Sequence, residues 1–388
     1  MTRYKKRKLL SAVKCCTLLI LPILAAGAAK GIPQVGKLIE KADEMTLGKS
    51  KTANTAAEAQ TSHDIKRAED YEDLINEEYI ISEGYGYSEE SDDTAVLAGA
   101  VSPLEAVSEN PGSKPYPTES EWTQGGSIVR TTYGTFSGAT YFDLEKCGQV
   151  NNQTTIPNET LINESTYLPD FTISKTSEPQ VLIYHTHTTE SFEPYVREFC
   201  DPNFNYRTTD DTKNMVMVGN EICRQLEAQG IGVIRATEIH DYPSYNGSYA
   251  RSRETIQPIL EQYPSIKVAL DIHRDAISSN GNAYQPFIEI DGREAAQIMI
   301  ISGCDDGTLG MPNYMKNFRF ASYLDQQLES DYPGLTRPIL FDYRKYNQDL
   351  TTGSLLIEVG SHGNTLEQVQ YSGQLIGASL ARSLISLQ

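Results

Sequence analysis

Short apolar runs typical of strands alternate with longer amphipathic runs typical of helices from Pro179 to the end of the chain. This alternation constrains the fold most strongly, because it favours an α/β fold with a mostly parallel sheet covered by helices. We expect strands at 181–184, 232–237, 267–271, 286–290, 297–302 and 354–359, and helices at 214–229, 249–262, 313–330 and 364–387. In such a fold, the residues that follow the strands gather at one edge of the sheet and build the functional site.

The run VLIYHTHTTE, residues 181–190, begins as a buried strand and continues as a polar loop. His187 and Glu190 are three residues apart, so one tight turn can bring both onto a single metal ion. If the strand ran on through His187, His185 and His187 would instead face the same way, as the HxH pair of barrel-type metal-dependent hydrolases does. Those barrels need more strand-end ligands than this chain has, so we favour His187 and Glu190. His185 is then expected to support a ligand or to contact substrate.

Two later segments offer partners for this pair. KVALDIH, residues 267–273, ends a strand with Asp271 and His273, which the two-residue period of a strand places on the same side. Asp271 is expected to hold one ring nitrogen of His273, as acceptors do for metal-ligating histidines; the alternative is a structural pair. SLLIEVG, residues 354–360, places Glu358 at the end of an apolar strand, where a carboxylate is costly to bury unless it is paired or reactive.

These residues form the donor set of a zinc hydrolase. Two histidines and one glutamate leave a fourth position of Zn²⁺ open, and a second glutamate serves as general base. We therefore predict His187, Glu190 and His273 as zinc ligands and Glu358 as the base. Three histidines are expected to have other roles: His63 and His240 lie on the surface, and His362 either contacts substrate or lies on the surface.

The N-terminus, residues 1–30, has a basic start followed by a mostly apolar stretch, which is typical of membrane targeting. It fits either a cleaved signal peptide or an uncleaved transmembrane anchor. We favour the single-pass anchor, because the long spacer that follows makes sense as a tether. In both cases the remaining chain is expected outside the cytoplasm.

Residues 31–125 have the composition of a disordered acidic linker, and residues 126–388 are expected to form the catalytic domain, with 126–178 as a small entry segment. The net charge of −19 argues against nucleic acid as a partner, because phosphate binding needs concentrated Lys and Arg. The six cysteines are too scattered to predict a disulfide framework.

Several motifs in fixed order resemble the stage II sporulation protein P family of peptidoglycan hydrolases. The resemblance covers residues 135–388 and rests on VLIYHTHTTESF, SYARSR, LDIHRDA, YPGLTR, YNQDL and LLIEVGSHGNTLEQ, which begin at residues 181, 248, 270, 332, 346 and 355. A basic N-terminus, one membrane segment, a spacer and a catalytic domain also agree with this family.

The resemblance implies a fold similar to that of zinc-dependent cell-wall amidases. It implies an N-acetylmuramoyl-L-alanine amidase, also credited with endopeptidase activity, that removes stem peptides from septal peptidoglycan during engulfment of the forespore. The implied location is the septal or engulfing membrane, in a complex with stage II sporulation proteins D and M. Two alternatives stay open: a cell-wall carboxypeptidase or endopeptidase with the same metal site, and a metal-free membrane-tethered scaffold.

The resemblance also bears on individual residues. His187, His273 and Glu358 match the two histidine ligands and the base. The second ligand is Glu190 in the carboxypeptidase pattern but falls on Asp210 or Asp211 in the cell-wall amidases, and we favour Glu190. Arginines are implied as partners for stem-peptide or lactyl oxygens, with ordinary salt bridges as the alternative. These are Arg251, Arg253 and Arg274.

Overall fold

The computed structural model describes residues 124–388 except 202, 203 and 205. The predicted membrane anchor and nearly all of the predicted linker therefore lie outside the described residues. Among the residues that are described, no helix is long and apolar enough to span a membrane. The four cysteines in this part of the chain, at 147, 200, 223 and 304, are free thiols.

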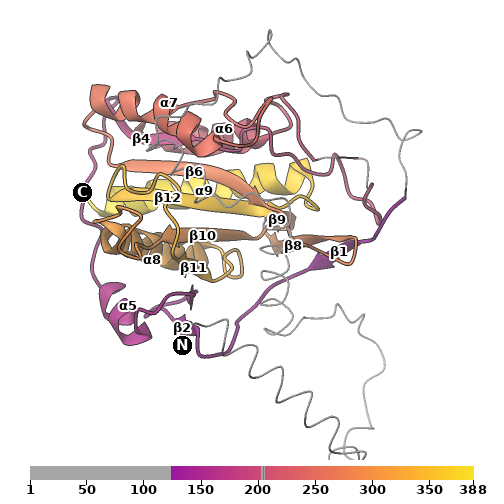
Figure 1. The fold of residues 1–388 in the computed structure, drawn as a ribbon, viewed down its shortest axis with the longest axis horizontal. Coiled ribbons are helices and arrows are strands. Elements are labelled where there is room, and N and C mark those ends of the chain that lie inside the picture. Colours follow the sequence, from indigo (N-terminus) through magenta and orange to yellow (C-terminus); the bar gives the residue numbers. More distant parts are fainter. Residues whose placement is uncertain (1–123, 202–203, 205) are drawn as a thin grey trace, which may run out of the picture. The chain divides into compact units, whose positions relative to one another are not determined.

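An eight-stranded sheet forms the centre of the structure (Figure 1). Its strands are β2 (Tyr141–Asp143), β3 (Gln149–Asn152), β4 (Pro179–Tyr184), β5 (Gly232–Arg235), β6 (Val268–Asp275), β10 (Ile298–Gly303), β11 (Ile339–Asp342) and β12 (Gly353–Ser361). Their order across the sheet is β2-β3-β11-β10-β12-β6-β4-β5. β6 and β12 lie in the middle, where neighbouring strands cover both edges.

The sheet is mixed, so the prediction of a mostly parallel sheet is wrong. β12, β6, β4 and β5 run parallel, but β10 is antiparallel to β12 and β2 is antiparallel to β3. β10 starts with Ile298 opposite Val359, at the carboxyl end of β12. β6 ends at this same edge of the sheet, and the chain between β6 and β10 stays there instead of crossing to the far edge, as a parallel strand would require. The chain enters β10 directly from the preceding hairpin, so it must run back along β12.

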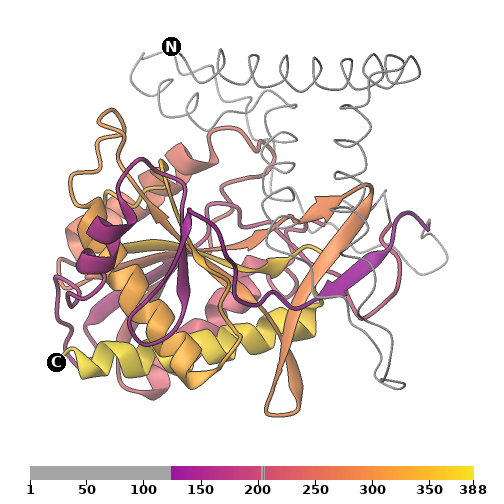
Figure 2. The same cartoon turned by 90° about the horizontal axis from the view of Figure 1, so that it is seen from below.

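That hairpin belongs to a second, smaller sheet. It consists of β8 (Asn282–Ile290) and β9 (Arg293–Ala296), with β1 (Ile128–Thr131) and β7 (Ser278–Ser279) also paired to β8. Figure 2 shows the long β8–β9 hairpin extending from the rest of the fold. The predicted entry segment thus supplies one strand here, two strands at the edge of the main sheet, and the short helix α5 (Asn158–Glu164).

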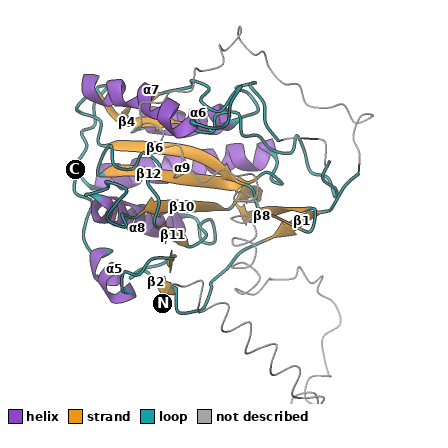
Figure 3. Ribbon diagram, in the orientation of Figure 1, coloured by secondary structure: helices purple, strands orange, loops and turns teal. Residues whose placement is uncertain are grey.

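Four longer helices cover the main sheet (Figure 3): α6 (Met215–Ala228), α7 (Ser248–Gln262), α8 (Tyr314–Asp331) and α9 (Leu366–Ser386). α6, α8 and α9 pack on one face, where Val181 and Ile183 of β4 point. α7 packs on the other face, with its Ile256 against Leu182 and Tyr184. This division follows from the alternation of side chains along a strand.

The predicted helices and strands from Pro179 onward are all present within a few residues of their predicted ends. β8 begins at Asn282 instead of residue 286, and the strands β7, β9 and β11 were not predicted. β6 continues to Asp275 instead of ending at residue 271. His273 therefore lies inside a central strand, with a fixed side-chain direction. α6 begins at Asn214, whose side chain accepts a hydrogen bond from the Val216 amide.

Asp325 of α8 is a buried carboxylate whose negative charge its surroundings do little to stabilise. Neither of its oxygens meets hydrogen-bond geometry with a described residue. Burial and the nearby Glu329 carboxylate raise the pKa of Asp325 well above its ordinary value, and the Thr336 hydroxyl opposes only part of this rise. The folded state therefore binds this proton more tightly than the unfolded state, and stability falls as the pH rises above about 4.

We expect Asp325→Asn to raise the free energy of unfolding at pH 7 by more than about 1 kcal/mol and to change it much less at pH 4. Urea unfolding of both proteins at both pH values measures the effect. Asp143→Asn, at an exposed position in β2, is the control and should alter neither value. A less stable Asp325→Asn protein at pH 7 would contradict the expectation.

Candidate metal and catalytic site

The turn after β4 separates the two histidines of the HTHTTE segment. β4 ends at Tyr184, and the chain turns before it reaches His187. The His185 side chain lies against α6 instead. The His185 ring is 2% exposed and its Nδ1 lies 3.0 Å from the Ile272 carbonyl oxygen. It packs so closely on α6 that a Cβ at Gly219 would lie 2.7 Å from Nε2. Burial lowers the pKa of His185 to about 4. Its surroundings give no support to a role in contacting substrate.

Asp271 of β6 holds the start of this turn. Its two carboxylate oxygens accept hydrogen bonds from the Thr186 amide at 2.8 Å and the Thr186 hydroxyl at 2.6 Å. Immediately after Thr186, the Glu190 amide donates to the His187 carbonyl oxygen at 3.1 Å and closes a tight turn. This local structure places His187 and Glu190 beside β6.

His273 lies between two carboxylates. Its Nε2 is 2.9 Å from Asp271 Oδ1, an ion-pair distance without the alignment of a good hydrogen bond, and its Nδ1 is 3.8 Å from Glu190 Oε2. Burial alone would lower the pKa of His273, but Asp271, Glu190 and Glu358 outweigh burial and raise it to about 10. The ring is thus protonated at neutral pH when no cation takes the place of the proton.

His187 completes the group. Its ring centroid is 5.0 Å from that of His273, nearly perpendicular to it, and its Nδ1 is buried with no hydrogen-bond partner among the described residues. Burial, His273 and the nearby Arg207 guanidinium lower the pKa of His187 well below its ordinary value. A neutral imidazole with an unpartnered nitrogen is available to bind a cation.

Glu358 lies on β12 directly beside His273, because the two residues are Cα partners in the parallel pair β6–β12. Its Oε2 is buried without a hydrogen-bond partner among the described residues. Burial, Asp275 and Glu190 raise the pKa of Glu358 to about 8, against the opposing effect of His273 and Arg337. The buried Arg337 guanidinium pairs with Asp275 at 2.8 Å and offsets part of this negative charge.

The donor set fits Zn²⁺, although its members do not already surround a common point. Within residues 124–388 without 202, 203 and 205, no three His, Cys, Asp or Glu side chains converge as a preformed metal site. Two observations nevertheless fit a cation: the orphaned, buried Nδ1 of His187, and the approach of Glu190 to His273. Imidazole nitrogens and a carboxylate are the ligands that zinc takes in hydrolases.

The alternative second ligands have other partners. Asp210 accepts hydrogen bonds from Thr212 and pairs with Lys213 at 3.0 Å, and Asp211 is exposed. Both belong to the turn before α6. Of the three candidates for the second ligand, Glu190 is the one that lies near His273, so the geometry favours it over Asp210 and Asp211.

The arginines of the motifs are held within the fold. Arg274 is buried, donates to the Ser191 and Tyr206 carbonyl oxygens, and its amide donates to Glu190 Oε2 at 3.1 Å. Arg253 makes a bidentate pair with Asp349. Arg253 thus forms the ordinary salt bridge given as the alternative, and Arg274 is held by backbone carbonyl oxygens. These contacts support structural roles better than direct contact with substrate.

Two histidine predictions need correction. His240 is 3% exposed, so its predicted surface position is wrong: its Nδ1 lies 2.7 Å from the His185 carbonyl oxygen and its Nε2 lies 2.9 Å from the Thr255 hydroxyl. His362 is also buried, beside the edge of the Tyr206 ring, so the surface alternative for it is wrong, whereas its contact with substrate stays a prediction. Burial together with Arg274 lowers the pKa of His362 to about 3. His63 lies outside the described residues.

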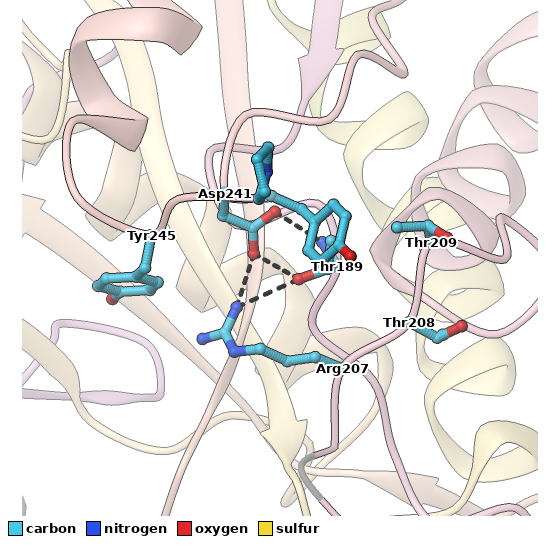
Figure 4. A pocket seen from close by; sticks show the side chains of 8 residues that line it. Thr189, Arg207, Thr208, Thr209, Asp241 and Tyr245 are labelled. Atoms are coloured by element: carbon cyan, nitrogen blue, oxygen red, sulfur yellow. Dashed lines mark hydrogen bonds and ion pairs between the residues drawn. The ribbon is translucent and has the colours of Figure 1, made fainter. Parts of the chain in front are cut away.

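A pocket of about 200 Å³, which no sequence pattern predicted, lies next to this group. Arg207, Asp241, Thr189 and Tyr245 line it, and Figure 4 shows the Arg207 guanidinium between the Tyr245 ring and the Asp241 carboxylate. Arg207 pairs with Asp241 at 2.6 Å. The dense aromatic and turn residues of DYPSYNGSY, from residue 241, were the one available sequence signal for this wall.

The family model of stage II sporulation protein P matches residues 41–381, so the chain belongs to the stage II sporulation protein P family. The resemblance seen in the motifs is thereby confirmed. Stage II sporulation protein P of Bacillus subtilis (strain 168) is 31% identical over 201 residues, which make up 49% of this chain and 47% of that protein. The match spans about half the length of this curated relative.

Solved structures of N-acetylmuramoyl-L-alanine amidases are similar to about half of the chain. AmiC2 of Nostoc punctiforme has 13% identity and a TM-score of 0.33, over 54% of this chain and 97% of that one. CwlD of Clostridioides difficile, solved with the GerS lipoprotein, has 11% identity and a TM-score of 0.33, over 53% and 99%. Ami1 of Mycobacterium smegmatis has 15% identity and a TM-score of 0.32, over 54% and 99%.

In metal-free protein, Asp271→Asn should lower the pKa of His273 from about 10, because Asp271 is the strongest influence that raises it against burial. A raised histidine pKa stabilises the fold fully below about pH 6.5, and this stabilisation is lost as the pH rises toward the folded value. The variant should lose that pH dependence. NMR titration of the His273 ring measures the change.

Asp241→Asn is the matched control for this experiment. Asp241 is also buried, and it accepts hydrogen bonds from the Thr189 amide at 3.0 Å and hydroxyl at 2.6 Å, just as Asp271 does from Thr186. Removing its charge should leave the His273 titration in place. An unchanged His273 pKa in Asp271→Asn would refute the assignment.

Proposed function

We propose that this chain is a zinc-dependent peptidoglycan hydrolase with N-acetylmuramoyl-L-alanine amidase activity. The observation that carries the proposal is that Glu190, His187 and Glu358 each lie beside His273, near the carboxyl-terminal parts of β4, β6 and β12. A carboxylate with a raised pKa beside two histidines, one of them with an unpartnered buried nitrogen, is an arrangement suited to hydrolysis of an amide.

In the proposed site His187, Glu190 and His273 hold the cation. The chemistry that zinc supplies when bound is polarisation of the scissile carbonyl and a lower pKa for water. Glu358 accepts a proton at Oε2 from the attacking water and returns it to the amine that leaves. Positive charge near Glu358 favours its ionised form, the form that can accept this proton. Asp271 keeps His273 in place by holding the opposite ring nitrogen.

Family membership supports the cellular part of the proposal. We propose that the chain acts outside the cytoplasm, held by a single membrane anchor, on septal peptidoglycan during engulfment, and that it works with stage II sporulation proteins D and M. The long acidic linker would let the catalytic part reach wall at a distance from the membrane.

The test is digestion of purified peptidoglycan by the full chain with zinc, compared with two variants. We expect His187→Ala to lose both zinc and activity. We expect Glu358→Gln to keep zinc and lose about 10²–10⁴-fold in kcat, the usual contribution of a general base. Glu367→Gln, which changes an exposed carboxylate at the start of α9, is the control and should behave as the unaltered chain.

Product analysis decides the bond that is cut. Glycan strands with muramic acid that has lost its stem peptide, together with free peptides that begin with alanine, indicate an amidase. Shortened or uncrosslinked stems on intact strands would mean a carboxypeptidase or endopeptidase instead. Normal digestion by zinc-free protein would end the metallohydrolase proposal, and an active Glu358→Gln would remove Glu358 as the base.

A further inference from the structure

His187 lacks the polar partner that metal-ligating histidines usually have. An imidazole that binds a metal through one nitrogen normally donates from the other to a carboxylate, carbonyl or water, which fixes the ring orientation. His273 has Asp271 in this position at 2.9 Å. No hydrogen bond joins the His187 ring to any described residue. The contacts that the structure shows for this ring are aromatic.

Aromatic rings surround His187 instead. The Tyr245 ring lies parallel to it, with centroids 4.4 Å apart and an interplanar angle of 5°. The Tyr249 ring meets it edge-on at 5.5 Å. Tyr245 is 42% exposed and lines the pocket, and the Arg207 guanidinium lies over its ring, 5.0 Å from the centroid. Stacking of this kind restricts rotation of the imidazole as a hydrogen bond would.

The loop that carries Tyr245 is tied to the turn that carries His187. The Thr188 hydroxyl donates to the Glu238 carbonyl oxygen at 2.7 Å, and Asp241 accepts hydrogen bonds from the Thr189 amide and hydroxyl. His240 Nδ1 lies 2.7 Å from the His185 carbonyl oxygen. The loop and the turn therefore move as one unit.

Arg251 of α7 anchors the other end of the loop. Its guanidinium donates to three backbone carbonyl oxygens on the loop, those of His240 at 2.6 Å, Asn246 at 2.8 Å and Ser244 at 2.7 Å. These carbonyls lie on both sides of Tyr245 in the chain. One planar side chain with five donors can hold a loop in this way, and a lysine cannot.

We propose that Tyr245 is the positioning residue for His187, and that Arg251 acts through the loop 238–247 to hold it there. The aromatic stack thus does for His187 what Asp271 does for His273. This inference rests on the proposed zinc site, because its purpose is to keep the His187 ring aimed at the cation. It assigns a function to the first arginine of the SYARSR motif, which contacts loop carbonyls and not substrate.

The experiment measures the zinc dissociation constant of the full chain by competition with a chromophoric chelator. Tyr245→Ala should weaken zinc binding by about 10–100-fold, the usual effect of losing a group that orients a ligand. Tyr245→Phe keeps the ring and should bind zinc within about twofold of the unaltered chain. Arg251→Gln should weaken binding in the same direction, because it releases the loop.

Tyr167→Ala is the matched control. Tyr167 is 50% exposed and contacts the Arg319 guanidinium through its ring face, so it resembles Tyr245 in exposure and in having an arginine neighbour. Its loss should not change zinc affinity. Circular dichroism and thermal unfolding of each variant show whether the fold is retained, and Tyr245→Phe serves as the rescue if Tyr245→Ala is less stable.

The outcomes separate this inference from the proposed function. Unaltered zinc affinity in Tyr245→Ala overturns the inference, as does a raised KM with unchanged zinc affinity, which would mean that Tyr245 contacts substrate. Equal losses in Tyr245→Phe and Tyr245→Ala would also overturn it, because the hydroxyl and not the stack would then matter. If the unaltered chain holds no zinc, the proposed function fails, and this inference fails with it.

Discussion

The candidate site depends on the buried carboxylate of Asp271. One of its oxygens accepts a hydrogen bond from the Thr186 amide and the other accepts one from the Thr186 hydroxyl. The same carboxylate lies 2.9 Å from His273 Nε2. A buried carboxylate is stable only when such partners replace water. Here the partners come from the turn after β4 and from β6, so satisfying this charge joins that turn to β6. His187, Glu190 and His273 are brought near one another as a result.

A second buried aspartate repeats this arrangement further along the same turn. Asp241 accepts the amide and hydroxyl of Thr189 and also pairs with Arg207. The turn from Thr186 to Glu190 is therefore held from β6 on one side and from the loop before α7 on the other. The two carboxylates have different neighbours: Asp271 lies beside His273, whereas Asp241 pairs with Arg207. The turn is rigid because both of its ends are fixed by charge-assisted hydrogen bonds.

The negative charge at the site is large, and its balance is incomplete without a cation. Asp271, Glu190 and Glu358 raise the pKa of His273 to about 10 against burial, and burial, Asp275 and Glu190 raise the pKa of Glu358 to about 8. Arg337 pairs with Asp275, and Arg274 approaches Glu190 through its amide. At neutral pH these raised pKa values favour bound protons on both side chains when no cation is present. Displacement of these protons by a divalent ion is consistent with the proposed metal site.

The sequence by itself determined the α/β class, the four long helices, six of the strands from Pro179 onward and the family, because apolar periodicity and ordered motifs are local properties of the chain. It did not predict the strands β7, β9 and β11. It also identified His187, Glu190, His273 and Glu358 as one candidate group, since all four follow or end apolar strands. Only the tertiary structure decided that the sheet is mixed, because the direction of β10 depends on the edge of the sheet at which the chain leaves the β8–β9 hairpin. It likewise decided the burial of His240 and the stack of Tyr245 on His187. Those contacts join residues more than fifty positions apart, and no local pattern records them.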